Sequence, residues 1–440
     1  METFFVKAAQ LLASLSILIV LHEMGHFLAA RYFGIRVEKF YLFFNPKFSL
    51  FKIKRGDTEF GIGWLPLGGY VKISGMIDES MDKEAMKEPP KDYEFRSKPA
   101  WQRLIVMVGG VVVNLILGFL IFIMIMGVWG KDRLPLENMS YGVHCDSLMY
   151  DYGFQEGDQI LGLEGRPEIR YMSEVTKEIL IHDARTIHLK RAGEEMHIEL
   201  PADVHLALLE KEVKSMFSPR FPFVIDSIIP NQLADSAGML KGDSLVAINN
   251  ITVNYFFDAT RQLGKNKGNT VDITVIRDGA ELVLPVKVSE AGKIGVAPKG
   301  ASNYLKLEHI DYSLAESIPA GTDEAIKTLT GYISSMKLLF SKEGASQIGG
   351  FGAIGGLFPS EWIWSEFWRL TAFLSLVLAF MNILPIPALD GGHVMFLMYE
   401  MISGRKPGEK FMEYAQIAGM ILLFGLLLYA NGNDLFRSLK

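Results

Sequence analysis

Residues 18–30 read LIVLHEMGHFLAA and place His22, Glu23 and His26 in a stretch that is otherwise apolar. In this H-E-x-x-H pattern the two histidines are just over one helical turn apart, so both imidazoles project from one face and can bind a single ion. Zinc is the ion that the pattern favours, because neutral imidazole suits it and two of the usual three protein ligands are present. Glu23 is placed to take a proton from a water molecule. The pattern therefore predicts a zinc hydrolase.

The alternative is a pair of core histidines whose polar atoms are satisfied by neighbouring groups. A carboxylate and two imidazoles are costly in apolar surroundings unless they serve a purpose. This cost favours the metal site over the core pair.

The composition indicates a membrane protein with several units. The chain has 440 residues, enough for more than one core, and 49% of them are hydrophobic, which predicts membrane spans. The formal net charge of -6 gives no support for nucleic-acid binding. Cys145 is the one cysteine, which excludes an intrachain disulfide and a metal-thiolate site. Glu2 and the lack of a small-residue cleavage site before His22 argue against a signal peptide.

Four apolar stretches predict four transmembrane helices. We expect them within residues 1–33, 100–130, 363–402 and 403–440. Arg31, Arg36 and Lys39 follow the first span closely, which favours the cytoplasm for residues 34–99. The N-terminus and the region after the second span then lie on the opposite side of the membrane. The zinc motif, near the C-terminal end of the first span, lies toward the cytoplasmic face.

The cytoplasmic segment contains a glycine-rich but apolar stretch, residues 59–75, which reads EFGIGWLPLGGYVKISG. Its β-branched and aromatic residues predict short strands, with a bend at Pro66, Gly68 and Gly69 before Tyr70. One interpretation is a loop that re-enters the lipid and whose exposed strand edge pairs with an extended peptide. The other is an ordinary hairpin packed on the protein. The residues leave both open.

The second span carries a single strongly polar residue, Asn114. Gly110 precedes it by one turn, which permits a close contact between helices and allows the amide to bond across that contact. We therefore expect Asn114 to face another helix.

Residues 131–215 and 216–292 contain an internal repeat. Two patterns recur: Gly157-Asp158 matches Gly242-Asp243, and Arg191-Ala-Gly193 matches Arg277-Asp-Gly279. The turns and alternating strand-like runs predict two small β-rich domains in tandem. The second resembles PDZ domains closely and the first more weakly. PDZ folds bind extended peptides by strand addition, and a repeat that serves only as a spacer is the alternative.

Residues 293–362 are expected to link the repeat to the third span. Apolar positions at helical spacing over 322–340 predict an amphipathic helix, either on the membrane surface or packed against the β-rich pair. Residues 349–356, GGFGAIGG, formally contain G-x-G-x-x-G, but no strand precedes them and no acid follows at the expected distance. We therefore expect a glycine-rich loop near the membrane and no nucleotide site.

The third span leads into residues 382–393, NILPIPALDGGH. Pro385 and Pro387 break the helix, so this stretch should face protein or a polar cavity. Asp390 lies at about the depth assigned to His22 and His26 and can complete the zinc site. A buried structural acid is the alternative, which is rarer at membrane depth.

These motifs resemble those of the site-2 protease family over nearly the whole chain. The resemblance rests on H-E-x-x-H, on Pro66-Leu-Gly-Gly-Tyr-Val-Lys72, on Gly110-x-x-x-Asn114, on the PDZ-like pair and on Asn382-x-x-Pro-x-Pro-x-Leu-Asp-Gly391. It implies an intramembrane zinc metalloprotease core of four transmembrane helices with a membrane-reentrant β element and two tandem PDZ-like domains. The implied roles are zinc ligands for His22, His26 and Asp390, catalytic base for Glu23, and substrate binding for Asn382, Pro385, Pro387, Gly68, Gly69 and Tyr70.

The resemblance also implies substrates and a location. Family substrates are single-pass membrane proteins already trimmed on the periplasmic side, among them anti-sigma factors and remnant signal peptides. The expected location is the bacterial inner membrane, with the lipid bilayer as a partner and the PDZ-like domains on the periplasmic side.

Two rival functions share parts of this pattern. One is a membrane-anchored PDZ adaptor with a structural zinc site, against which a three-ligand set with an open fourth position and Glu23 both argue. The other is the second class of membrane zincins with H-E-x-x-H, in which a downstream glutamate is the third ligand. Leu389-Asp390-Gly391 argues against that class.

Overall fold

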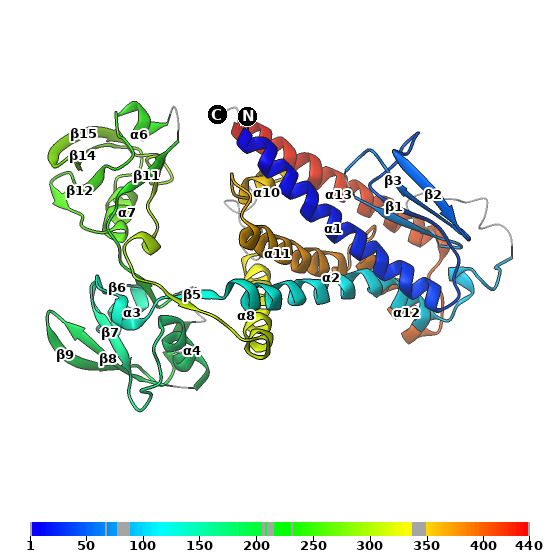
Figure 1. Ribbon diagram of the computed structural model, residues 1–440, viewed down its shortest axis with the longest axis horizontal. Coiled ribbons are helices and arrows are strands. Elements are labelled where there is room, and N and C mark those ends of the chain that lie inside the picture. Colours follow the sequence, from blue (N-terminus) through cyan, green and yellow to red (C-terminus); the bar gives the residue numbers. More distant parts are fainter. Residues whose placement is uncertain are drawn as a thin grey trace. The chain divides into compact units, whose positions relative to one another are not determined.

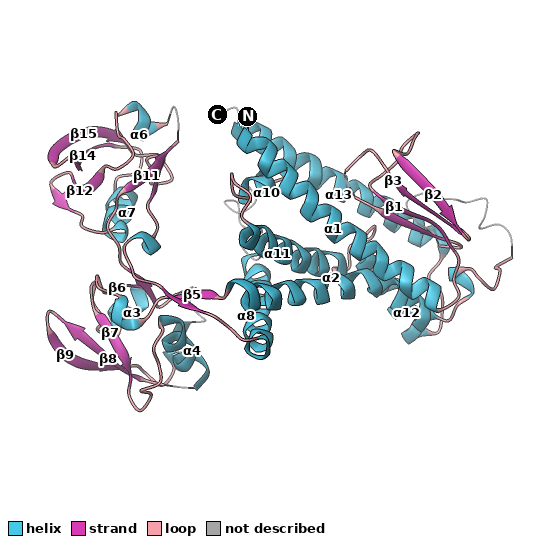
Figure 2. Ribbon diagram, in the orientation of Figure 1, coloured by secondary structure: helices cyan, strands magenta, loops and turns pink. Residues whose placement is uncertain are grey.

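The computed structural model describes residues 2–66, 68–76, 89–182, 184–204, 207–208, 215–229, 232–336 and 349–438. The chain divides into two compact units, which we call the membrane unit (Met1–Gly130 with Asp311–Lys440) and the β unit (Lys131–Ile310). Helices dominate the membrane unit and strands the β unit (Figures 1 and 2). Each unit is described by itself below.

Four helices of the membrane unit are long and apolar enough to cross a membrane: α1 (Glu2–Tyr32), α2 (Ala100–Trp129), α11 (Trp364–Ile383) and α13 (Glu409–Ser438). They confirm the four predicted transmembrane helices. The unit also contains α8 (Leu314–Met336), α10 (Phe351–Leu357), α12 (Asp390–Ser403) and the short 3-10 turn η2 (Phe95–Ser97). Helix α2 is central, because it packs against α1, α8, α11 and α12.

Helices α1 and α2 approach closely at glycines. A Cβ added to Gly25 would lie 2.3 Å from the Gly109 carbonyl oxygen, and one added to Gly109 would lie 2.6 Å from the Gly25 carbonyl oxygen. Only hydrogen at both positions allows this approach. The crossing therefore brings the histidine-bearing turn of α1 directly against α2.

A four-stranded sheet follows α1, with β1 (Val37–Leu42), β2 (Phe51–Arg55), β3 (Thr58–Ile62) and β4 (Tyr70–Ile73) in the order β2-β3-β1-β4. Strand β1 is parallel to β3, and the other pairs are antiparallel. The predicted strands within residues 59–75 are confirmed as β3 and β4. They do not form a hairpin with each other, because β1 lies between them. Strand β4 is thus left at one edge of the sheet.

The expectation of a glycine-rich loop at residues 349–356 is wrong, because most of this stretch forms α10. Its first turn is capped by another helix: the N–H groups of Gly350 and Ala353 both donate to Asp434 Oδ2 of α13 at 2.9 Å. An acidic side chain at a helix start satisfies otherwise unpaired N–H groups and favours the helix dipole. This cap is distant in the sequence, so the local glycines gave no sign of it.

The helix predicted over 322–340 begins earlier, at Leu314, and its last four predicted residues lie outside the described part of the chain. Helix α8 packs tightly on α2. A Cβ added to Gly321 would lie 2.4 Å from the Ile123 Cα. Its placement is therefore decided by packing within the membrane unit.

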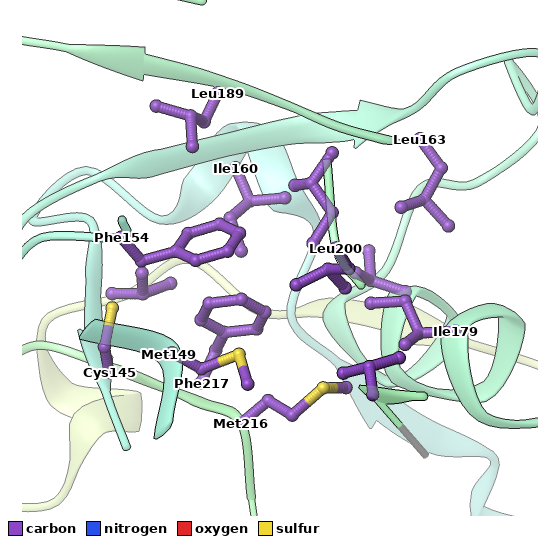
Figure 3. Close-up of a cluster of buried hydrophobic side chains, with 14 of the residues drawn as sticks. Cys145, Met149, Phe154, Ile160, Leu163, Ile179, Leu189, Leu200, Met216 and Phe217 are labelled. Carbon is purple, nitrogen blue, oxygen red and sulfur yellow. The ribbon is translucent and has the colours of Figure 1, made fainter. Parts of the chain in front are cut away.

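The β unit contains two β-rich regions with separate cores. The first consists of β5 (Lys131–Arg133), η3 (Leu136–Asn138), β6 (Val143–Cys145), α3 (Ser147–Asp151), β7 (Gln159–Leu163), α4 (Met172–His182), β8 (Thr186–Arg191), β9 (Glu194–Glu199) and β10 (Phe217–Pro219). Figure 3 shows its core, in which Phe154 and Phe217 lie close together. Because β10 pairs with β6, this region extends past the expected boundary at residue 215.

The second region consists of β11 (Ile225–Ile228), α6 (Leu233–Ser236), β12 (Ser244–Ile248), β13 (Ile251–Thr252), α7 (Phe256–Lys265), β14 (Thr270–Arg277), β15 (Ala280–Lys287) and β16 (Val296–Pro298). It also extends past the expected boundary, at residue 292, because β16 pairs with β11. After η4 (Ala301–Asn303), β17 (Glu308–Ile310) returns and pairs with β5. The unit thus begins and ends in one short antiparallel ladder.

The internal repeat is visible as two matching ion pairs. Arg191 Nε and an NH2 group donate to the two carboxylate oxygens of Asp158, both at 2.8 Å. Arg277 binds Asp243 in the same way, at 2.7 Å in both contacts. Both aspartates are 1% exposed. The Gly-Asp and Arg-x-Gly patterns are therefore two ends of one buried bidentate bridge, built once in each region.

A charge cluster joins the two β-rich regions at Glu156. His144 Nδ1–H donates to Glu156 Oε1 at 2.6 Å, and the Tyr150 hydroxyl and the Arg261 guanidinium donate to the same oxygen. Arg261 belongs to α7 of the second region. The His144 ring also stacks on Phe257 of α7, with centroids 4.1 Å apart. Burial by itself raises the pKa of Glu156, but these hydrogen bonds outweigh burial and lower the pKa to about 2.

The Glu156→Gln substitution should lower the free energy of unfolding of the β unit by about 2 kcal/mol at pH 7, because it removes the charge that three donors share. Folding lowers the pKa of Glu156 from 4.5 to about 2. The ionised carboxylate therefore stabilises the folded β unit fully above pH 4.5, and this contribution is lost as the pH falls toward 2. Thermal unfolding of the full chain in detergent at several pH values measures this. Glu164→Gln, at an exposed carboxylate, is the control; equal stability of the two variants at pH 7 would contradict the prediction.

Candidate metal centre

Three polar side chains from two distant segments meet in the membrane unit. His22 and His26 lie on α1, and Asp390 is the first residue of α12, directly after the proline-containing break. Their ligand atoms lie within 4.8 Å of one another, and no other group of three or more His, Cys, Asp or Glu side chains in the described ranges does the same. The helix break thus delivers a carboxylate to the H-E-x-x-H turn.

The distances within this group fit a tetrahedral zinc ion. His22 Nε2 lies 3.2 Å from His26 Nε2 and 3.2 Å from Asp390 Oδ2, and His26 Nε2 lies 3.4 Å from the same oxygen. Ligand bonds of about 2.0–2.2 Å at tetrahedral angles place two ligand atoms roughly 3.3–3.6 Å apart. Asp390 Oδ2 is also buried without a hydrogen-bond partner in the described structure. A cation among the three atoms would satisfy it.

Glu23 and the three side chains line one cavity of about 1120 Å³. Its walls come from α1, β4, α10, α12 and α13, and most of them are apolar, including Met420, Leu423 and Phe424 of α13. This volume lies slightly above the range of about 300–1,000 Å³ that is usual for small-molecule sites in proteins. The cavity is thus a large, mostly apolar space next to the three-residue cluster.

Strand β4 runs along this cavity. Gly69, just before it, lies against α1: an added Cβ would be 2.6 Å from Ile19 Cγ2 and 3.4 Å from Glu23 Cγ. The Tyr70 ring stacks on Tyr41 with centroids 5.3 Å apart. In the described sheet β4 pairs only with β1. Strand β4 is therefore an edge strand of the described sheet and lines the cavity.

The remaining candidate residues are placed differently. Asn382 lies at the cluster, with Nδ2 3.5 Å from His22 Nε2. Pro387 packs against Gly419 of α13: a Cβ added to this glycine would lie 1.8 Å from the Pro387 carbonyl oxygen. Pro385 lies in the break between α11 and α12, and Gly68 adopts a φ of 152° beside Phe44. Of the six substrate-binding candidates, the cavity lining includes Gly69 and Tyr70.

Two residues of α2 belong to the site more closely than the sequence indicated. A Cβ added to Gly110 would lie 2.5 Å from His26 Nε2 and 2.6 Å from His22 Cε1. Asn114 Nδ2 lies 3.3 Å from His22 Nδ1. The sequence predicted a close helix contact and a cross-helix amide bond here. Only the structure shows that both imidazoles pack against Gly110 and that the Asn114 amide contacts the His22 ring.

Comparison with known proteins decides the family. A family model described as peptidase family M50 matches residues 10–426. The chain belongs to peptidase family M50. Membership of the site-2 protease family is thereby confirmed, and the protein is an intramembrane zinc metalloprotease. The adaptor and the second zincin class are excluded as its function.

Individual relatives of this M50 peptidase agree. The chain is 25% identical to the regulator of sigma-E protease RseP of Escherichia coli, over 99% of this chain and 100% of that protein. It is 26% identical to the regulator of sigma E protease of Haemophilus influenzae, over 99% and 100% of the two chains. It is also 27% identical to the metalloprotease MmpA of Caulobacter vibrioides, over 99% and 96%. The apolar helices and these bacterial relatives indicate a bacterial inner-membrane protein.

Proposed function

We propose that His22, His26 and Asp390 hold the catalytic zinc and that Glu23 is the general base of peptide hydrolysis. The observation that carries this proposal is the set of three ligand atoms 3.2–3.4 Å apart, with a buried Asp390 oxygen that has no other described partner. When bound, zinc polarises the scissile carbonyl and lowers the pKa of water. Glu23, which lines the same cavity, takes the proton of the attacking water and passes it to the leaving amine.

The substrate is a transmembrane segment held in extended form. A peptide carbonyl inside a helix is already hydrogen-bonded and shielded, so the segment must unwind before attack. The edge of β4 that faces away from β1 can bind such a segment by strand addition beside Glu23. The apolar cavity wall formed by α13 suits the apolar side chains of a transmembrane substrate segment. Asn382, at His22, is placed to donate to the substrate near the scissile bond.

Strands β2 and β3 form the membrane-reentrant element. Every side chain of β2 is exposed, and the hairpin with its flanking residues presents Phe48, Phe51 and Trp64, with exposed fractions of 57%, 56% and 41%. Exposed aromatic groups of this size favour the membrane interface. Lys52 and Lys54 alternate with the apolar residues of β2, and they suit anionic headgroups. This supports insertion of the hairpin into the cytoplasmic leaflet.

The two β-rich regions are PDZ-like domains on the periplasmic side, where they control access by size. Their repeated bridges, and the strand orders β7-β8-β9 and β12-β14-β15, support a tandem of one fold. The E. coli relative is named a regulator of sigma-E protease. We extend this to the present chain as cleavage of trimmed single-pass proteins, including an anti-sigma factor and remnant signal peptides.

The ligand set is tested by metal analysis of the full chain purified in detergent. His22→Ala, His26→Ala and Asp390→Ala should each lose most of the bound zinc, because three protein ligands are the minimum of such a site. His393→Ala is the matched control, since this histidine is one turn beyond Asp390 and outside the three-residue cluster. Full zinc occupancy in Asp390→Ala would refute its role as third ligand.

The size filter is tested by removing most of the β unit. Because Arg133 of β5 is paired with Glu308 of β17, a short turn can replace residues 134–307 and keep the ladder that joins α2 to α8. The shortened protein should still cleave a trimmed substrate and should also cleave an untrimmed one that the intact enzyme refuses. If it is zinc-loaded and membrane-inserted yet cleaves neither, the β unit belongs to the catalytic apparatus.

A further inference from the structure

We infer that the side-chain amide of Asn114 selects the metal-binding tautomer of His22, by accepting a hydrogen bond from His22 Nδ1–H through its oxygen. This makes Asn114 a positioning residue that acts through His22, and the inference rests on the ligand set proposed above. Asn114 lies on α2 and is 1% exposed, and its amide is 3.3 Å from His22 Nδ1. The contact is therefore buried and within reach of a hydrogen bond.

The proposed ligand set requires a particular tautomer of each histidine. The Nε2 atoms of His22 and His26 both face Asp390. To bind the proposed zinc there, each must offer a lone pair at Nε2, so the proton must sit on Nδ1. His26 meets this requirement, because its Nδ1 lies 2.8 Å from the Val106 carbonyl oxygen. A carbonyl can only accept, so this contact admits the Nδ1–H form alone.

For His22 the corresponding neighbour is an amide, which can present either of two groups. With the NH2 group toward Nδ1, the amide donates, and the ring proton moves to Nε2, where it blocks the metal. With the oxygen toward Nδ1, the ring keeps its proton there and Nε2 is free to bind. The two arrangements differ only by half a turn of the amide.

Nothing in the described structure opposes that half-turn. Asn114 Oδ1 is buried and has no hydrogen-bond partner among the described residues, so exchanging the two amide atoms breaks no bond at that position. The backbone of Asn114 is fixed independently, since the buried Ser375 hydroxyl donates to its carbonyl at 2.7 Å. The metal-bound state therefore selects the oxygen-inward amide without any movement of α2.

The test measures zinc affinity by chelator competition, together with the absorption spectrum of the cobalt-substituted full-length protein. Asn114→Leu, of similar size but unable to accept, should bind zinc about 10–100-fold more weakly, as expected for loss of an outer partner of a metal ligand. Asn114→Asp, which can only accept, should bind zinc about as tightly as the unmodified protein and keep its cobalt spectrum. Asn114→Ala replaces the leucine variant if thermal unfolding shows that the latter does not fold.

The outcomes separate the inference from simpler explanations. If Asn114→Asp loses affinity as Asn114→Leu does, the amide acts as a donor and the inference is overturned. Unchanged affinity in Asn114→Leu overturns it as well. Ser375→Ala removes the neighbouring buried hydrogen bond without touching His22 and should keep zinc affinity; an equal loss there would show that packing alone is measured. Zinc retained in His22→Ala would instead refute the ligand set.

Discussion

Glu23→Gln should reduce proteolysis by about 10²–10⁴-fold while leaving bound zinc unchanged, because glutamine keeps the shape of the side chain but cannot take a proton. Glu23 lines the cavity beside the metal cluster, yet it is not one of its three members. Cleavage of a trimmed model substrate in detergent and metal analysis of the same preparation measure the two quantities. A loss of activity without loss of metal separates the base from the ligands.

The matched control is Glu366→Gln, which removes a carboxylate in the first turn of α11, outside the cavity lining. It should retain both activity and zinc. Substantial proteolysis by Glu23→Gln would refute Glu23 as the base, whereas loss of zinc in that variant would make Glu23 part of the metal site.

Gly110→Ala should weaken zinc binding and proteolysis together, although it adds only one methyl group and changes no polar group. The added carbon would lie 2.5 Å from His26 Nε2 and 2.8 Å from His22 Nδ1, which is closer than such atoms can approach. One or both imidazoles must then move away from Asp390. We expect zinc affinity to fall by at least about tenfold, which corresponds to roughly 1.4 kcal/mol.

Gly127→Ala on the same helix is the control for this substitution. Its added carbon would lie 3.3 Å from Ser317 Oγ, so a small adjustment of one side chain accommodates it. Zinc titration and thermal unfolding of both variants distinguish a local effect on the imidazoles from general damage to α2. Normal zinc affinity in Gly110→Ala would show that the two histidines are not held against this glycine.

Local sequence patterns were sufficient for much of this protein. The H-E-x-x-H spacing depends only on helical periodicity, so it specified which imidazoles share a face before any packing was known. The four transmembrane helices follow from length and hydrophobicity, because the bilayer imposes both. The Gly-Asp and Arg-x-Gly repeats predicted two related β-rich regions, and the structure shows that each pair forms one buried bridge.

The tertiary structure decided the features that join distant segments. It placed β1 between β3 and β4, which left β4 at an edge beside Glu23, and it turned a glycine-rich stretch into α10 through Asp434. It also set the imidazoles of α1 over Gly110 and Asn114 of α2. The physical reason is common to all of these. Periodicity and propensity act within a few residues, whereas strand order, distant caps and helix crossings depend on which surfaces pack together across the whole membrane unit.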